Sequence, residues 1–313
     1  MRPLAVAGNV NVDLIMGTLP PWPTPGTEVF VDHDEMRPGG AAGNVALAWQ
    51  ALGATFQIAG NLGNDQFGTY LRREFGAIAA RWPVAPVRTT YSVGLTHPDG
   101  ERTFVTTQGH LAAFSGDDVL ACLDATALSG GILLLCGAFL LPAMTRDFGT
   151  IAAWAAEHDI DIALDTGWPP GGWTAETVAE AQGWLAKSRY ALFNEVEACA
   201  VTGTSDVEAA VTALLDLMPK KQKQTQAVVK RGPNGAIGAS RAEGTIAARA
   251  LDVTVIDTIG AGDAFNAGFL YATAREQPFA DAIRHGVATA SAAISTVPRS
   301  YAGAAMISEG YSR

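Results

Sequence analysis

The segment from Asp257 to Asp263, Asp-Thr-Ile-Gly-Ala-Gly-Asp, combines the residue types that phosphate chemistry needs. Small and apolar residues follow it and predict a helix, so Gly260, Ala261 and Gly262 fall at a helix start. Backbone N–H groups at such a start lack partners within the helix and bind anions, helped by the helix dipole. Asp263 then lies beside the anion. Its carboxylate can accept the proton of a hydroxyl that attacks a phosphate, or it can act as a mere N-terminal cap.

Two further segments place glycines or polar side chains where strands and helices should meet. Gly39 and Gly40 precede a predicted helix and let the backbone approach a ligand closely. Asn44 either caps this helix or faces the ligand. Asn11 and Asp13 follow the first apolar stretch of the chain. Because polar groups at the carboxyl end of a parallel strand commonly face the ligand crevice, we expect both near a ligand.

Short apolar stretches alternate with helical stretches along most of the chain. The predicted strands are residues 4–10, 56–59, 132–136, 160–164, 190–193 and 227–229, with a further strand-like stretch at 253–256. The predicted helices are residues 43–52, 67–80, 144–158, 175–187, 207–218 and 264–275. This alternation indicates an α/β fold, with a central, mostly parallel sheet flanked by helices on both faces.

Residues 16–38 and 88–108 interrupt the alternation. The first stretch is rich in proline, and the second has β-branched residues around Asp99-Gly100, a dipeptide typical of a tight hairpin. We expect the two stretches to form a small β-lid that projects from the main sheet, closes over a substrate and excludes water. Since such a lid exposes sheet edges, which proteins often cover or pair, we expect a homodimer joined through the lids.

Composition excludes several classes of protein. The chain is 48% hydrophobic and 17% charged, which is typical of a globular domain, and we expect one domain over residues 1–313. Its net charge of −10 makes nucleic acid an unexpected partner. The longest apolar run, residues 132–141, is too short to span a membrane. Cys122, Cys136 and Cys199 form no Cys-x-x-Cys pair and no export signal is visible, so we expect buried thiols in a reducing cytoplasm.

The glycine-rich segments resemble the two signatures of the PfkB, or ribokinase-like, carbohydrate kinases. Gly39-Gly40-x-x-x-Asn44 is similar to the N-terminal signature, and the segment from Asp257 to Asp263, with Phe265 after it, is similar to the C-terminal one. The resemblance spans nearly the whole chain and implies a ribokinase-like fold with a β-lid. It also implies transfer of phosphate from ATP, with Mg²⁺, to a hydroxyl of a small sugar.

The resemblance assigns roles to the residues of both signatures. It implies that Asp263 is the catalytic base. The anion hole for the transferred phosphate would consist of the N–H groups of Gly260, Ala261 and Gly262, with Gly262 also against the nucleotide. The sugar would be held by Asn11, Asp13, Gly39, Gly40 and Asn44.

Two more elements resemble the nucleotide site of the family. Asn194 and Glu197 match an Asn-x-x-Glu element linked to phosphate positioning and to Mg²⁺, which Glu197 would reach through water. Taken alone, both residues would equally suit an exposed helix start. Lys230, Gly232 and Gly235 match a nucleotide-binding turn. Taken alone, the two glycines would indicate a β-turn after a strand.

The chain departs from the family pattern at three places. Residues 165–169, Asp-Thr-Gly-Trp-Pro, stand where relatives often carry Asp-x-Asn-x-Arg, so the Arg that would contact phosphate is missing. Residues 136–139 offer no acidic ligand for a sugar. Residues 9–13 differ from the Asn-Pro-type signature of kinases that act on phosphorylated sugars. We therefore expect an unphosphorylated substrate that need not be ribose.

Two other functions remain open from the sequence. A nucleoside kinase of the same fold would stack a base on an aromatic side chain such as Phe139 or Trp22. A catalytically silent sugar-binding protein would also share the fold, although the presence of Asp263 argues against it. His110 follows the lid and is a candidate for substrate contact, but a surface position is the simpler expectation.

A monovalent cation such as K⁺ is the last ligand that the resemblance implies. In many relatives this ion lies beside the anion hole, at a place that corresponds to Asp257. The later loop of this chain, residues 295–301, lacks the Gly-Ala step of those relatives. We therefore expect Arg299 to pair with Asp257 and K⁺ to have a weak effect, while an exposed Arg299 is an equally good explanation.

Overall fold

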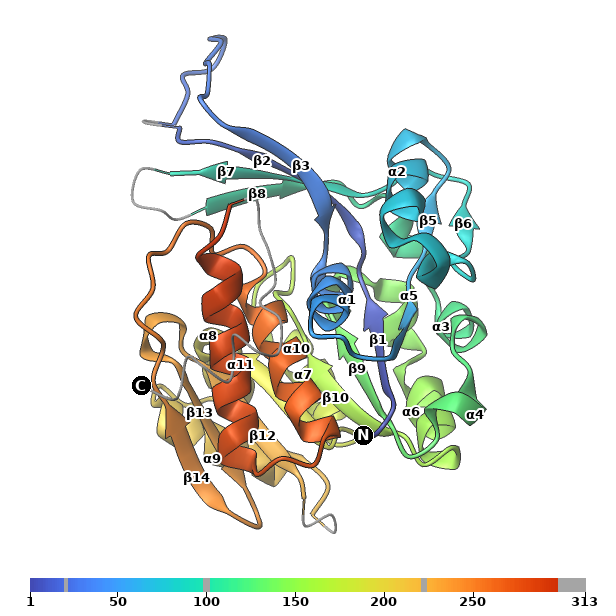
Figure 1. Ribbon diagram of the computed structural model, residues 1–313, viewed down its shortest axis with the longest axis vertical. Helices are drawn as coiled ribbons and strands as arrows, with labels where there is room; N and C mark the ends of the chain where they lie inside the picture. Colours follow the sequence, from blue (N-terminus) through green and yellow to red (C-terminus); the bar gives the residue numbers. More distant parts are fainter. Residues whose placement is uncertain (20–21, 98–101, 221–223, 298–313) are drawn as a thin grey trace.

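The chain is organised around a large central β-sheet and a smaller sheet beside it (Figure 1). The computed structural model describes residues 1–19, 22–97, 102–220 and 224–297. Over these residues the central sheet has the order β14-β13-β12-β11-β10-β9-β1-β4, parallel from β12 to β4 and antiparallel at β13 and β14. Its strands are β1 (Leu4–Gly8), β4 (Phe56–Ala59), β9 (Ile132–Cys136), β10 (Asp161–Asp165), β11 (Tyr190–Asn194), β12 (Gln226–Lys230), β13 (Ala236–Ser240) and β14 (Gly244–Ala248).

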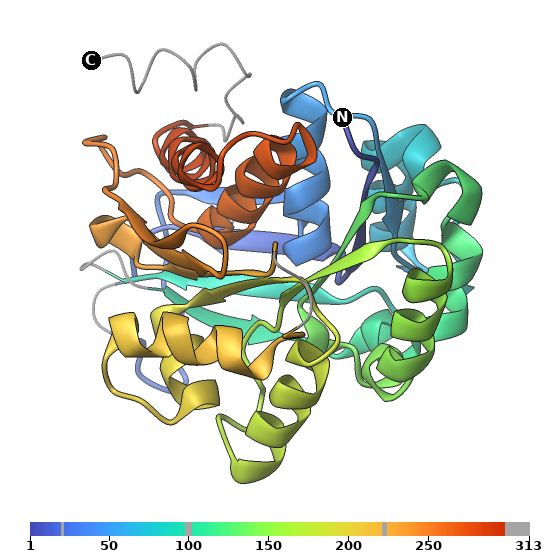
Figure 2. The ribbon, with the colours of Figure 1, turned by 90° about the horizontal axis from the view of Figure 1, so that it is seen from below.

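Helices cover both faces of the central sheet (Figure 2). One face carries α1 (Ala41–Ala51), α10 (Ala261–Ala274) and α11 (Phe279–Ile294), and the other carries α7 (Ala175–Leu185), α8 (Glu195–Thr202) and α9 (Val207–Leu217). The remaining helices are α2 (Gln66–Phe75), α3 (Gly116–Cys122), α4 (Ala125–Leu128), α5 (Pro142–Arg146) and α6 (Phe148–Glu157). Because both faces are covered, strands such as β9 are buried throughout and read as unbroken apolar runs. The predicted α/β fold is confirmed.

The smaller sheet, called the lid sheet here, has the strand order β3-β2-β7-β8. Its strands are β2 (Asn11–Met16), β3 (Asp34–Gly39), β7 (Tyr91–Thr96) and β8 (Arg102–Thr106). The first strand begins before the predicted residue 16, and the described part of residues 17–33 contains no strand. The prolines of that stretch explain the gap, since proline cannot donate to a strand ladder. The predicted turn at Asp99-Gly100 lies outside the described residues.

Strand pairing gives the lid sheet one polar and one apolar face. Arg37, Asp13 and Ser92 lie side by side in one row across β3, β2 and β7. This face turns toward the central domain, because Arg37 forms an ion pair there with Asp257. The neighbouring row, on the opposite face, contains only apolar side chains: Met36, Leu14, Val93 and Val105.

Two predicted elements are wrong in detail, and several elements were not predicted. Residues 253–256 form no strand, and the N–H groups of Ile256 and Asp257 instead donate to the carbonyl oxygen of Ile294 at the end of α11 (2.8 and 3.1 Å). The Val255 and Ile256 side chains are exposed, whereas those of a central strand would be buried. The helix predicted over 144–158 is two helices that meet at Asp147. The strands β13 and β14 and the helices α3, α8 and α11 were not among the predicted elements.

The expectation of buried thiols holds for two of the three cysteines. Within the described ranges, no helix is long and apolar enough to cross a membrane. Cys122 and Cys136 are buried free thiols, and Cys199 is a half-buried one. Burial raises the pKa of the Cys136 thiol well above its ordinary value, so this thiol is unreactive.

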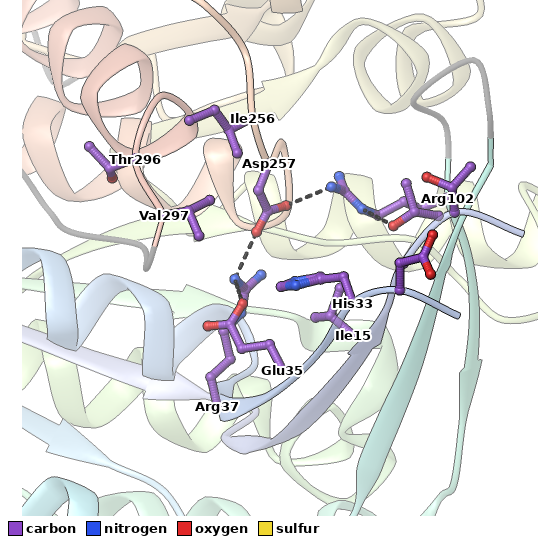
Figure 3. Close-up of a pocket in the computed structure, with 13 residues that line it drawn as sticks. Ile15, His33, Glu35, Arg37, Arg102, Ile256, Asp257, Thr296 and Val297 are labelled. Atoms are coloured by element: carbon purple, nitrogen blue, oxygen red, sulfur yellow. Dashed lines mark hydrogen bonds and ion pairs between the residues drawn. The ribbon is translucent and has the colours of Figure 1, made fainter. Parts of the chain in front are cut away.

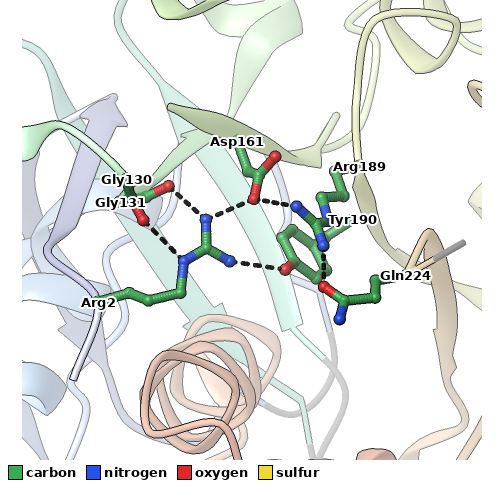
Figure 4. A network of polar contacts seen from close by, with 7 residues as sticks. All are labelled: Arg2, Gly130, Gly131, Asp161, Arg189, Tyr190 and Gln224. Atoms are coloured by element: carbon green, nitrogen blue, oxygen red, sulfur yellow. Dashed lines mark hydrogen bonds and ion pairs between the residues drawn. The ribbon is translucent and has the colours of Figure 1, made fainter. Parts of the chain in front are cut away.

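Arg2 fixes the beginning of β1 at the amino ends of the parallel strands (Figure 4). Its guanidinium pairs with Asp161 and donates to the carbonyl oxygens of Gly130 and Gly131 (2.8 Å each). Arg189 pairs with the same carboxylate at 2.6 Å. Ligands of parallel sheets bind at the opposite, carboxyl ends of the strands. We therefore assign this network to stability.

His110 joins the lid sheet to the core. The sequence had suggested a surface position, but the side chain is buried. The Thr90 N–H donates to its Nδ1 (2.8 Å), so the proton sits on Nε2, which donates to the Val10 carbonyl oxygen (3.1 Å). Burial lowers its pKa to about 4. A second proton, on Nδ1, would point at the Thr90 N–H and replace a hydrogen bond by a clash of two donors. Both ring nitrogens therefore have a structural role.

Lowering the pH from about 6.5 to 4 should destabilise the protein through His110. The unfolded ring accepts a proton near pH 6.5 and the folded ring only near pH 4, so about 3 kcal/mol of unfolding free energy is present above pH 6.5 and lost toward pH 4. Urea unfolding at each pH measures it. His110→Gln should flatten that part of the profile, whereas the exposed His33→Gln should not. An unchanged profile in a folded His110→Gln variant would contradict the assignment.

Candidate active site

The two glycine-rich segments start neighbouring helices and bring Asn44 and Asp263 into contact. Helix α1 begins after Gly40 (φ 82°) and α10 after Gly260 (φ 68°), two backbone conformations that glycine adopts without strain. Asn44 and Asp263 each lie in the first turn of their helix. The Asn44 Nδ2 donates to the Asp263 Oδ2 at 2.8 Å. Residues 219 positions apart in the sequence thus meet at the helix N-termini.

The predicted sugar-binding residues of the lid sheet gather beside this contact. Asn11 and Asp13 are buried on β2, and the Asn11 Nδ2 donates to the Asp13 Oδ1 at 2.7 Å. A Cβ atom on Gly39 would lie 2.1 Å from the Asp13 Oδ2, and one on Gly40 would lie 2.4 Å from the Asn9 carbonyl oxygen. Both positions therefore need glycine. The structure brings Asn11, Asp13, Gly39, Gly40 and Asn44 together as the sequence had suggested.

Lys230, whose side chain is only 12% exposed, lies behind the glycine turn of α10. The Lys230 Nζ donates to the Asp165 Oδ2 at 2.7 Å and to the Asn266 Oδ1 at 3.2 Å. A Cβ atom on Gly262 would lie 3.4 Å from the same Nζ. Burial lowers the pKa of Lys230, but the carboxylates of Asp165 and Glu197 outweigh it and raise the pKa overall. The lysine is therefore charged, directly beside the predicted anion hole.

Asn194 and Glu197 form a capping box at the start of α8. The Asn194 Oδ1 accepts from the Glu197 N–H and the Glu197 Oε2 accepts from the Asn194 N–H, both at 2.9 Å. The helix start is thus as expected, but Glu197 is only 4% exposed. Burial, with the nearby Asp165 carboxylate, raises its pKa to about 7. A cap needs no such burial, so Glu197 also belongs to the Asp165 and Lys230 group.

The buried carboxylates of Glu197 and Asp165 bear on where Mg²⁺ could be held. No three His, Cys, Asp or Glu side chains in the described ranges come together as a metal site. Mg²⁺ keeps several waters and commonly takes one or two carboxylates together with substrate phosphates. Glu197, a buried carboxylate with the Asp165 carboxylate nearby, fits that pattern.

The predicted nucleotide turn links β12 to β13. Gly232 (φ 51°) and Gly235 (φ 82°) flank a short turn of 3₁₀ helix, Gly232–Asn234. A Cβ atom on Gly235 would lie 2.0 Å from the Ala248 carbonyl oxygen, so a side chain cannot fit there. The β-turn that the glycines indicated by themselves is present, on the same strand end as Lys230.

Asp257 is held by two arginines of the lid sheet (Figure 3). Its Oδ2 pairs with the Arg37 Nη1 at 2.7 Å and its Oδ1 with the Arg102 Nη2 at 3.0 Å. These three residues line a cavity of about 330 Å³ between the lid sheet and the loop before α10. Both carboxylate oxygens face a guanidinium, so the side chain fits an arginine pair better than a monovalent cation. Arg299, the expected partner, lies outside the described residues.

The aromatic candidates for stacking on a base have other neighbours. The Phe139 ring packs against the rings of Trp173 and Trp184, with centroids 5.5 and 4.9 Å away. Trp22 is 57% exposed and lies 5.8 Å from the ring of His97. Phe139 therefore packs at the edge of the core.

The sequence analysis did not identify four residues of the site: Asp165, Asn266, Arg37 and Arg102. Asp165 ends a buried strand, and a polar residue at such a strand end is the signal that pointed to Asn11 and Asp13, so it could have been found. Asn266 lies one turn after Gly262 on α10 and could have been found from helical spacing. The two arginines carry no such signal, because their partner depends on how the lid sheet sits over α10.

Solved ribokinases share the whole architecture. The ribokinase of Thermotoga maritima superposes with a TM-score of 0.79 at 19% identity, covering 100% of both chains. The ribokinase of Arabidopsis thaliana, solved in complex with ribose and ATP, gives a TM-score of 0.77 at 22% identity, covering 98% of each chain. These superpositions show that the chain has the ribokinase-like fold.

The chain belongs to the pfkB family of carbohydrate kinases, whose family model matches residues 1–300. The 1-phosphofructokinase of Haloferax volcanii is 33% identical over 257 residues, 81% of this chain and 78% of that protein. The ribokinase of Bacillus subtilis is 27% identical over 300 residues, 94% of this chain and 93% of that protein. Kinases of this family use ATP, typically with Mg²⁺. The resemblance noted in the sequence is confirmed.

Proposed function

We propose that this protein phosphorylates a hydroxyl of a small, unphosphorylated sugar with ATP, and that Asp263 is the general base. The contact between Asn44 and Asp263 is the observation that carries the proposal, because it joins the sugar-binding and catalytic segments at one point. The sugar hydroxyl gives its proton to Asp263, and its oxygen forms a bond to the γ-phosphorus. The bond between that phosphorus and the bridging oxygen breaks, and ADP leaves.

The anion hole and the nucleotide site follow from the same geometry. The N–H groups of Gly260 and Gly262 at the start of α10 would stabilise the charge on the transferred phosphoryl group, with Lys230 behind them. The Ala261 N–H donates to the Thr258 carbonyl oxygen at 3.1 Å, so its part in the anion hole requires that this bond open.

The nucleotide would lie along the ends of β11 and β12, against Asn194 and the turn at Gly232 and Gly235. Bound with ATP, Mg²⁺ would neutralise phosphate charge, and Glu197 would hold one of its waters.

The polar set of the sugar site favours a neutral substrate. Asn11, Asp13 and Asn44 offer amide and carboxylate groups that suit hydroxyls, and Asp13 would repel a phosphate placed beside it. The names of the relatives, 1-phosphofructokinase and ribokinase, point to different sugars. The choice between a phosphorylated and a neutral substrate therefore rests on these residues.

Release of ADP, measured over a panel of sugars, sugar phosphates and nucleosides with Mg²⁺-ATP, tests the proposal. We expect the highest kcat/KM with a neutral sugar. A preference for nucleosides would replace the proposal with a nucleoside kinase, and a preference for sugar phosphates would correct the substrate class. Sugar binding by calorimetry without any ADP release would indicate a catalytically silent binding protein.

We also propose that two copies pair through the apolar face of their lid sheets. Met36 and Val105 lie in its apolar row and are 48% and 58% exposed. We expect light scattering to give a dimer, and Val105→Glu to give a monomer because a buried charge would oppose pairing. Val84→Glu, at a comparably exposed site outside the lid sheet, should remain dimeric. A monomeric parent protein at all working concentrations would contradict the dimer.

A further inference from the structure

The loop that leads into the anion hole is held from the lid sheet by Arg37 and Arg102. Arg102, on β8, pairs with the Asp257 Oδ1 at 3.0 Å and donates from Nη1 to the Thr258 Oγ1 at 2.8 Å. Arg37, on β3, pairs with the Asp257 Oδ2 at 2.7 Å. Both arginine side chains are about nine-tenths buried. Two lid strands thus contact two consecutive residues of the loop.

Asp257 also shapes the glycine turn. Its Oδ1, which pairs with Arg102, accepts a hydrogen bond from the Ile259 N–H at 2.9 Å. Gly260, the next residue, then adopts φ 68° and starts α10. One carboxylate is therefore shared between the lid arginines and the turn, so a displacement of the arginines must displace the turn.

The lid sheet carries the sugar-binding residues on the same face. In the strand register, Asp13 on β2 lies opposite Arg37 on β3, and the proposed sugar ligands Asn11 and Gly39 also lie opposite each other. A strand pair moves as a unit because backbone hydrogen bonds join its residues. A sugar that holds Asp13 and Asn11 therefore also fixes where the Arg37 guanidinium lies.

We propose that Arg37 and Arg102 are positioning residues that set the Gly260–Gly262 turn through Asp257, so that sugar bound to the lid sheet completes the anion hole. This inference rests on the proposed kinase function. In this proposal the two arginines contact neither the sugar hydroxyl nor the transferred phosphate. Since their two positive charges already occupy both oxygens of Asp257, the turn needs no monovalent cation at that carboxylate.

Loss of either guanidinium should lower kcat more than it changes KM. A misplaced turn affects the transition state, and a displacement of about 1 Å can cost about 10²-fold in rate. We expect about that loss of kcat in Arg102→Ala, with the KM for ATP and for the sugar nearly unchanged. Arg102→Lys should lose less than Arg102→Ala, because its ammonium can still pair with Asp257.

Chemical rescue separates positioning from a general loss of structure. Arg102 lines the cavity of about 330 Å³, so in Arg102→Ala a guanidinium ion can enter and pair with Asp257. Low millimolar guanidinium chloride should restore part of the lost kcat in this variant and none in the parent enzyme. Arg73→Ala, which removes an exposed arginine paired with Glu74, is the matched control and should keep full kcat.

Three results would overturn the inference while leaving the kinase function intact. They are full kcat in the double variant Arg37→Ala and Arg102→Ala, a loss of kcat in Arg102→Ala that guanidinium does not restore, and strong activation of the parent enzyme when KCl replaces NaCl. Thermal melting checks that each variant is folded, and Arg102→Gln replaces Arg102→Ala if the latter is not. A parent enzyme that releases no ADP with any sugar would instead refute the proposed function.

Discussion

Replacing Asp263 by asparagine should lower kcat by about 10²–10⁴-fold, the usual contribution of a general base. The change keeps the shape of the side chain and an oxygen that can accept from the Asn44 Nδ2, so the contact of 2.8 Å between α1 and α10 can persist. It removes the group that takes the proton of the attacking hydroxyl. Because the proposed nucleotide site lies at the ends of β11 and β12, the affinity for ATP should change little.

Steady-state ADP release and calorimetric titration of ATP measure the two parts of this prediction. Asp281→Asn is the matched control, since Asp281 is an exposed carboxylate in the first turn of the neighbouring α11 and pairs only with Arg284 in the described contacts. It should keep the parent kcat. Unchanged turnover in a folded Asp263→Asn variant would exclude Asp263 as the base.

Replacing Lys230 by methionine should reduce both activity and stability. It removes a positive charge from behind the anion hole, for which the loss of a single transition-state donor, about 10²–10³-fold in kcat, is a guide. It also leaves the buried Asp165 carboxylate without a cation, so that among the described residues only the Gly167 N–H and the Asn266 amide still donate to it. Breaking a buried ion pair from one side typically costs about 3–5 kcal/mol of unfolding free energy.

A second variant separates the two losses. In the double variant Lys230→Met and Asp165→Asn both members of the ion pair are neutral, so most of the stability should return while kcat stays low. Urea unfolding and ADP release measure the two quantities. Recovery of kcat together with stability would show that Lys230 serves the fold alone.

The sequence predicted the central sheet well because its strands are buried on both faces. Runs such as Ile132–Cys136 cannot occur in a solvated segment, so their apolar character identifies them without tertiary information. Residues 253–256 show the limit of this argument. Their β-branched composition is that of a strand, but no neighbouring strand was available to pair with them, and pairing depends on the whole fold.

The candidate site likewise contains residues that local sequence patterns identify and residues that depend on the whole fold. Gly40, Gly260 and Asp263 belong to local helix starts, which short patterns can identify. The contacts of Lys230 with Asp165 and of Arg37 with Asp257 join residues 65 or more positions apart. Charge patterning along the chain cannot reveal such pairs, because any of the other carboxylates would have been an equally suitable partner. The interpretation of His110 failed for the same reason, since its burial depends on Thr90 and Val10.

The position of β1 in the central sheet governs when this protein can complete its fold during synthesis. Strand β1 lies between β4 and β9, which both follow it in the sequence, so its two neighbours appear only after residues 59 and 136 have been made. The Arg2 N–H then donates to the Ala274 carbonyl oxygen at the end of α10, at 2.7 Å. One edge of strand β1 can therefore pair only after residue 59 and the other only after residue 136, so the nascent chain exposes an apolar strand edge, a feature that favours aggregation, until nearly half of it has been translated.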